Sequence, residues 1–347
     1  MEIQINNQEA LEKLREESKK YNLGRYKSGI RKWLHIDDDE ILDIVLAGMI
    51  AEKVGGDPLW LFLIAPPGGS KTELLRSFSN PDYFHHLSDM TSKTLISGLV
   101  VSESEENNGK EINKKSKRRK IEDLLPQLNG KVLLFKDFTT ILEKGRDEKR
   151  EIIAQFRECY DGSFAKKVGT VDKTISYSSR FGLIAGVTPI IDKHWKVMQQ
   201  LGERFLKVRW KENPDLVTKR SIENESYEKV MRNELTENSN NFISNLKFDK
   251  VPTFDDNKLG DFVSKIAKFI AHARTPISFK EGSDDFYFEF IPTPEVPTRL
   301  VKQLKKSAKC LALVREKLEV DNEEVQTLLR IAKDTIPQDR LAILEII

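Results

Sequence analysis

The chain has 347 residues, of which 32% are charged and 39% are hydrophobic. A domain takes roughly 100–200 residues, so this length predicts about two domains, and the apolar content is too high for a disordered chain. Lysine and arginine (57) nearly balance aspartate and glutamate (55), which leaves a net charge of +2 and requires any nucleic-acid-binding surface to be a local feature.

The sequence argues against a membrane protein and against a secreted one. No apolar run reaches the roughly 18 residues of a membrane span, and the polar residues 1–17 lack the apolar stretch of a signal peptide. The two cysteines, Cys159 and Cys310, lie far apart, which disfavours a disulfide framework and a zinc cluster. We therefore expect a cytoplasmic protein with no membrane contact.

The chain is predicted to begin with a helical extension over residues 1–37, which are charged with scattered apolar positions. A helix is predicted to start near Asp38, because acidic residues precede the apolar run 41–50 and complement the helix dipole. The short apolar run 59–65 lies between turn signals and is typical of a buried strand in a parallel sheet.

Two further buried strands are predicted over residues 131–137 and 181–188, with a helix over about 148–160 before the second of them. Residues 102–120 are almost free of apolar side chains and predict a mobile, solvated insertion with a basic end, Lys114–Lys120. That end is either an electrostatic arm or a solubilising insertion. Residues 164–175 alternate weakly around a Gly-Thr pair, as in a β-hairpin.

The last part of the chain, residues 213–347, is predicted to hold a mixed linker region and then a helical lid. Residues 212–290 are polar with no clear period, and residues 292–347 have the apolar spacing of helices. The core that holds the three predicted strands is thereby placed at residues 38–212. The predicted fold class is α/β: a parallel-sheet core with an N-terminal helical extension and a C-terminal helical lid.

The strongest motif is a glycine loop, the name we use for residues 65–70, with the Lys-Thr pair that follows it. It approximates the phosphate-binding pattern G-x-x-x-x-G-K-[ST] between a strand and a helix, although Ala65 and Ser70 replace the two outer glycines. Lys71 is expected to reach the β- and γ-phosphates of ATP, and the Thr72 hydroxyl to bind Mg²⁺. The expected nucleotide-binding residues are Pro67, Gly68, Gly69, Ser70, Lys71 and Thr72. The alternative is an ordinary glycine-rich turn.

Two polar residues at strand ends complete the predicted catalytic set. Asp137 ends the second buried strand, where a carboxylate holds Mg²⁺ in phosphoryl-transfer proteins. Lys136 stands where a second acid is usual, which leaves the catalytic base open, with Glu151 on the next helix as an alternative. Thr188 ends the third strand. It either senses the γ-phosphate or orients the attacking water, or it simply caps the strand.

With these strands in order, the chain resembles AAA+ ATPases, and more narrowly the helicase branch that includes minichromosome maintenance proteins and phage or plasmid replication ATPases. The resemblance covers residues 38–210 and the tail from Pro292. It is carried by the loop and by four short segments. These segments are Val132–Thr139 (VLLFKDFT), Gln155–Ser163 (QFRECYDGS), Leu201–Phe205 (LGERF) and Pro297–Leu300 (PTRL).

The resemblance implies an ATP-hydrolysing motor on DNA, in which ATP and Mg²⁺ are cofactors and a homo-oligomeric ring is the working form. It implies that Arg204 is an arginine finger toward a neighbouring subunit and that Arg299 contacts the nucleotide in cis. The hairpin is expected to hold single-stranded DNA independently of sequence, through Lys166, Lys167 and Lys173. Two alternatives remain: a nucleotide-gated interaction module with little hydrolysis, and a phosphotransferase acting on a small substrate.

Overall fold

Five short strands form one parallel sheet in the order β2-β5-β8-β1-β9. The computed structural model describes residues 21–96, 100–102, 118–120, 123–168, 173–194, 198, 204–277 and 291–346. The strands are β1 (Trp60–Ile64), β2 (Phe84–Leu87), β5 (Val132–Phe135), β8 (Gly182–Val187) and β9 (Phe205–Arg209). The predicted α/β class and the three predicted buried strands, now β1, β5 and β8, are confirmed. The edge strands β2 and β9 were not predicted.

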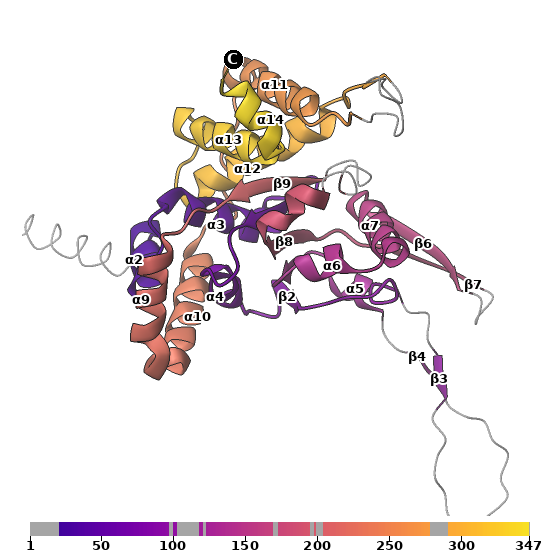
Figure 1. Ribbon diagram of the computed structural model, residues 1–347, viewed down its shortest axis with the longest axis horizontal. Coiled ribbons are helices and arrows are strands. Elements are labelled where there is room, and N and C mark those ends of the chain that lie inside the picture. The colour runs from indigo at the N-terminus through magenta and orange to yellow at the C-terminus, as the bar shows by residue number, and fades with distance from the viewer. Residues whose placement is uncertain are drawn as a thin grey trace, which may run out of the picture.

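Helices cover both faces of the sheet (Figure 1). Side chains alternate along a strand, so Leu61 and Leu63 of β1 face one hydrophobic cluster while Trp60 and Phe62 face the other. The first cluster includes α3 (Asp39–Val54), and the second includes α6 (Thr139–Glu143) and α7 (Arg146–Tyr160). The strands are therefore apolar throughout, as strands buried on both faces must be.

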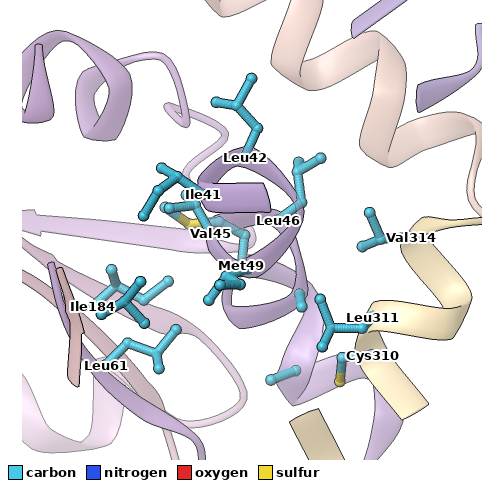
Figure 2. Close-up of a cluster of buried hydrophobic side chains, with 14 of the residues drawn as sticks. Ile41, Leu42, Val45, Leu46, Met49, Leu61, Ile184, Cys310, Leu311 and Val314 are labelled. Atoms are coloured by element: carbon cyan, nitrogen blue, oxygen red, sulfur yellow. The ribbon is translucent and has the colours of Figure 1, made fainter. Parts of the chain in front are cut away.

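Helix α3 lies between the sheet and α12 (Thr298–Val314), as Figure 2 shows. Its residues 41–51 are all buried, because one side of the helix meets Leu61 and Ile184 and the other meets α12. Its N-terminus is capped by Asp38, whose side chain accepts hydrogen bonds from the amides of Glu40 and Ile41. This agrees with the helix start predicted from the sequence.

Three helices from distant parts of the chain form a group beside α4 (Lys71–Arg76). They are α2 (Leu23–Trp33), α9 (Pro214–Asn224) and α10 (Glu228–Asn245) (Figure 1). Asn238 of α10 donates a hydrogen bond to the Tyr26 carbonyl oxygen of α2 at 2.9 Å. Asn224 of α9 donates to the Trp33 carbonyl oxygen at 2.7 Å. These amide contacts fix the end of α2 against the α9–α10 pair.

Helices α11 (Asp256–Ala273), α13 (Asn322–Thr335) and α14 (Gln338–Leu344) group with α12 (Figure 1). Helix α13 closes the β9 edge of the sheet: the Lys207 and Arg209 amides donate to Thr335 Oγ1 and Asp334 Oδ2. This satisfies amides that an open edge would leave unpaired. Within the described ranges, no helix combines the length and the apolarity needed to cross a membrane.

We predict that Gly48→Ala lowers the stability of the protein. Gly48 lies in α3, and a Cβ atom there would come within 2.6 Å of Leu61 Cδ1 and 2.9 Å of an Ile184 methyl carbon. Overpacking costs about 1–3 kcal/mol, more than the gain of about 1 kcal/mol in helix propensity. We expect the free energy of unfolding in urea to fall.

The matched control is Gly260→Ala in α11, where a Cβ atom meets only ordinary contacts with Asp256. There the same change removes a helix-interior glycine without a clash, so we expect a gain of about 0.5–1 kcal/mol. If both variants were stabilised equally, the close approach of α3 to the sheet would be wrong.

Candidate functional site

The glycine loop connects the carboxyl end of β1 to α4. Gly68 has φ +79°, a left-handed conformation that glycine adopts without strain. Gly69 lies against the side chain of Glu212, which comes from another part of the chain. A Cβ atom at position 69 would overlap Glu212 Oε2. The two glycines therefore allow the tight turn and the close approach that the motif requires.

Lys71, the first residue of α4, is turned back into the loop. Its ammonium group donates hydrogen bonds to the carbonyl oxygens of Ala65 at 2.6 Å and Pro66 at 2.7 Å, and only 7% of the residue is exposed. Burial lowers the pKa of Lys71, and the negative charges of Glu212 and Asp137 oppose that shift. The ammonium is thus held inside the loop, and the two carboxylates are near enough to stabilise its positive charge.

The loop already holds an anionic oxygen. The Ser70 amide donates a hydrogen bond to Glu212 Oε1 at 3.0 Å, and the same carboxylate lies against Gly69. An amide that points at a carboxylate in this way can also bind a phosphate oxygen, since both are anionic acceptors. The loop therefore fits a phosphate group by the chemistry of its own contacts. Glu212 was not among the predicted site residues.

Asp137 and Thr188 lie at the same edge of the sheet as the loop, since β5, β8 and β1 are neighbouring parallel strands. Asp137 Oδ1 accepts a hydrogen bond from the Thr139 amide at 2.9 Å. The Thr139 hydroxyl accepts from the Thr188 amide, and the two hydroxyl oxygens are 3.3 Å apart. The three predicted residues Lys71, Asp137 and Thr188 are thus brought together, with Thr139 as an additional member.

The two predicted metal ligands are the hydroxyl of Thr72, a residue in the first turn of α4, and the carboxylate of Asp137, which follows β5. Hydroxyl and carboxylate oxygens are the ligands that Mg²⁺ prefers, so this donor set fits the predicted metal. Glu151, the alternative acid, is exposed on α7 and accepts a hydrogen bond from Gln155 at 3.5 Å.

A cavity of about 170 Å³ adjoins the glycine loop. Gly68 and Gly69 form one wall, the end of α2 another, and α9 and α10 the third; the lining includes Trp33, Met231, Arg220 and Arg232. Arg232 also bonds Glu73 of α4 at 3.1 Å. The helices beside the loop are therefore α2, α9 and α10, whereas α12 and α13 pack on α3 and β9.

The two predicted arginines lie elsewhere. Arg204 precedes β9, is 4% exposed, and donates to Asp161 at 2.7 Å. Its guanidinium group lies over the ring of Tyr160, and this ring packs edge-on against Trp60, the first residue of β1. Arg204 is therefore at the amino ends of the strands, the edge opposite the glycine loop. A role toward a neighbouring subunit stays a prediction.

Arg299, at the start of α12, also lies over the Tyr160 ring, 5.7 Å from its centroid. The structure thus separates Arg299 from Lys71 by the length of the sheet. The arrangement does not bring Arg299 to the glycine loop, and its contact with the nucleotide in cis stays a prediction. A short Pro-Thr-Arg-Leu match carries no information about which end of the sheet its helix faces. The arginines beside the loop are Arg220 and Arg232 of α9 and α10.

The predicted hairpin is present as β6 (Ser163–Val168) and β7 (Lys173–Ser178), which pair antiparallel and immediately precede β8. It extends from the side of the sheet remote from α9 and α10 (Figure 1). The backbones of Lys166, Lys167 and Lys173 belong to the ladder, while their side chains and the turn at 169–172 lie outside the described residues. The same holds for most of the 102–120 insertion, whose ends pair as β3 (Val100–Ser102) and β4 (Arg118–Lys120).

Among the described residues, the cysteines and the acidic cluster found there do not form a competing site. Cys159 and Cys310 are buried free thiols, and burial raises the pKa of each to about 12, which keeps them unreactive at neutral pH. An acidic cluster at Asp321, Glu323 and Glu324 already surrounds the Lys317 ammonium. No protein-family model matches the sequence, and a search of curated proteins finds no significant match.

Proposed function

We propose that the protein binds a nucleoside triphosphate, with ATP and Mg²⁺ as the expected pair, and hydrolyses it. The observation that carries this proposal is the hydrogen bond of the Ser70 amide to an anionic oxygen inside a glycine loop that also holds the Lys71 ammonium. Asp137 and Thr188 at the next two strand ends support it, because ligands of parallel α/β sheets bind outside the carboxyl ends of the strands.

Each residue of this edge has a chemical task in the proposal. The Ser70 amide and Lys71 bind the phosphate oxygens and offset the charge that develops on them. Thr72 and Asp137 would hold Mg²⁺, which supplies charge neutralisation between the phosphates when bound. Thr188 and Thr139 position the attacking water through their hydroxyl groups. The nucleoside enters the adjoining cavity between Trp33 and Met231, where Arg220 and Arg232 attract its phosphates.

We further propose that hydrolysis drives work on single-stranded DNA, in a ring of identical subunits of the AAA+ helicase branch. Two features support this. The sheet order places the strand of Thr188 between the strands of the loop and Asp137, and a hairpin precedes the Thr188 strand, as the sequence resemblance implies. In such a ring, Arg204 reaches a neighbour's nucleotide only after its contact with Asp161 is released.

A nucleotide-gated interaction module with little hydrolysis is the second candidate. It is favoured by Lys136, which stands beside Asp137 in place of a second acid, because a water molecule attacking a phosphate needs a proton acceptor. Measuring turnover with and without single-stranded DNA separates the two: DNA-stimulated hydrolysis supports the motor, and tight binding without turnover supports the module.

We predict that Lys71→Ala weakens ATP binding by roughly 10- to 100-fold while the fold persists. The variant loses a charge-assisted contact worth about 1.5–3 kcal/mol. Isothermal titration calorimetry gives the affinity, and circular dichroism checks the fold. Lys258→Ala, at an 81% exposed lysine of α11, is the matched control and is expected to bind as the parent does. Equal affinity in both variants would refute the loop assignment.

We predict that Asp137→Asn keeps ATP binding and loses Mg²⁺-dependent turnover by about 100-fold or more, since a metal ligand contributes several kcal/mol to stabilisation of the developing charge. Phosphate release measures the rate, and Asp261→Asn on the exposed face of α11 is the control. Glu151→Gln is tested in parallel. If that variant loses turnover and Asp137→Asn does not, the metal site lies on α7.

We predict that replacing Lys166, Lys167 and Lys173 together with alanine weakens binding of all single-stranded DNA sequences alike. The slope of log affinity against log salt should flatten by about 0.7 for each lost phosphate contact. Fluorescence anisotropy at several salt concentrations measures both. The control replaces the exposed α11 lysines Lys258, Lys265 and Lys268. Should only the control flatten the slope, DNA would lie on α11 instead of the hairpin.

A further inference from the structure

The carboxylate of Glu212 occupies the position in the glycine loop that an anionic ligand needs. Glu212 comes three residues after the end of β9, and its side chain turns back to the loop. Oε1 accepts the Ser70 amide hydrogen bond at 3.0 Å, and Oε2 lies where a side chain on Gly69 would be. Meanwhile the Lys71 ammonium is bound to the carbonyl oxygens of Ala65 and Pro66.

We propose that Glu212 is an internal competitor that keeps the loop closed until a phosphate chain displaces it. This inference rests on the proposed nucleotide-binding function and adds the regulation of that site. A phosphate oxygen and the Glu212 carboxylate are acceptors for the same Ser70 amide, so one excludes the other. Their like charges also repel at short distance, most strongly where water is excluded. Binding therefore requires Glu212 to leave.

The exit of Glu212 moves the chain on either side of it, because the chain is anchored shortly before and directly after this residue. Trp210, two residues before it, is buried, and its amide donates to the Ile64 carbonyl oxygen at the end of β1. Asn213, the next residue, caps α9 by accepting from the amides of Asp215 and Leu216. A rotation of the chain at Glu212 is thus passed to the start of α9, which lines the cavity with α10.

Competition by Glu212 also distinguishes ligands with phosphate groups from ligands without them. A nucleoside without phosphates can enter the cavity between Trp33 and Met231 but offers nothing to replace the carboxylate on Ser70. A triphosphate supplies the competing oxygens and a charge that Lys71 attracts. The helices α9 and α10 would then change position only with a phosphate-bearing ligand. Their position would therefore differ between the empty loop and the phosphate-bound loop.

The test compares Glu212→Ala with the parent in titrations with ATP and, separately, with adenosine. The apparent affinity of a protein is reduced by the fraction of molecules that is closed. Glu212→Ala should therefore bind ATP roughly tenfold more tightly or better, the equivalent of one charged hydrogen bond. Most of the gain should be in the association rate, and adenosine binding should be unchanged. The conservative Glu212→Gln should shift in the same direction by less.

The control is Glu225→Ala, which removes an exposed carboxylate between α9 and α10 and corrects for the change in net charge. Unchanged or weaker ATP binding in both Glu212 variants overturns the competitor, while the nucleotide function stands as long as Lys71→Ala impairs binding. If neither the parent nor the variants bind ATP, the proposed function fails and the competitor with it. An equal gain in adenosine affinity also overturns it, because the effect would then not involve phosphate.

Discussion

The parallel alignment of β1, β5 and β8 is the constraint on which the site depends. Parallel strands end at the same edge of a sheet, and their continuous ladders hold these ends in register: Ile64 is opposite Val187, and Phe135 opposite Ala185. The residues that follow each strand therefore meet without long connections. Because β8 lies between β5 and β1, Thr188 lies between the glycine loop and Asp137.

The centre of the fold could be predicted from the sequence, whereas its edges could not. The three central strands are buried on both faces, so their residues form uninterrupted apolar runs in the sequence. Strand β2 contains His85 and His86, and β9 contains Lys207 and Arg209, which break that pattern. These edge strands are defined by their partners: β2 by the ladder with β5, and β9 by β1 on one side and Thr335 and Asp334 of α13 on the other.

The residues of the candidate site also fall into a group that the sequence predicted and a group that it did not. Lys71, Asp137 and Thr188 each follow an apolar strand, so their common location follows from the chain order alone. Glu212 and Arg232 belong to the polar region after β9. The pairing of β9 with β1 brings Glu212 to the loop, and the packing of α10 beside α4 brings Arg232 there. The position of Arg299 also depends on packing. Its segment matches a short motif, but the burial of α12 against α3 directs its guanidinium to Tyr160 at the opposite edge.

The position of α3 between the sheet and α12 (Figure 2) has a consequence for biosynthesis. Helix α3 is synthesised before the five strands of the sheet, yet α12, which covers its outer side, is synthesised after all of them. Until α12 leaves the ribosome, apolar side chains on that side, such as Leu46, lack their partner, and folding must wait for a contact between distant segments. The nascent chain therefore exposes the apolar outer side of α3 throughout the synthesis of the sheet.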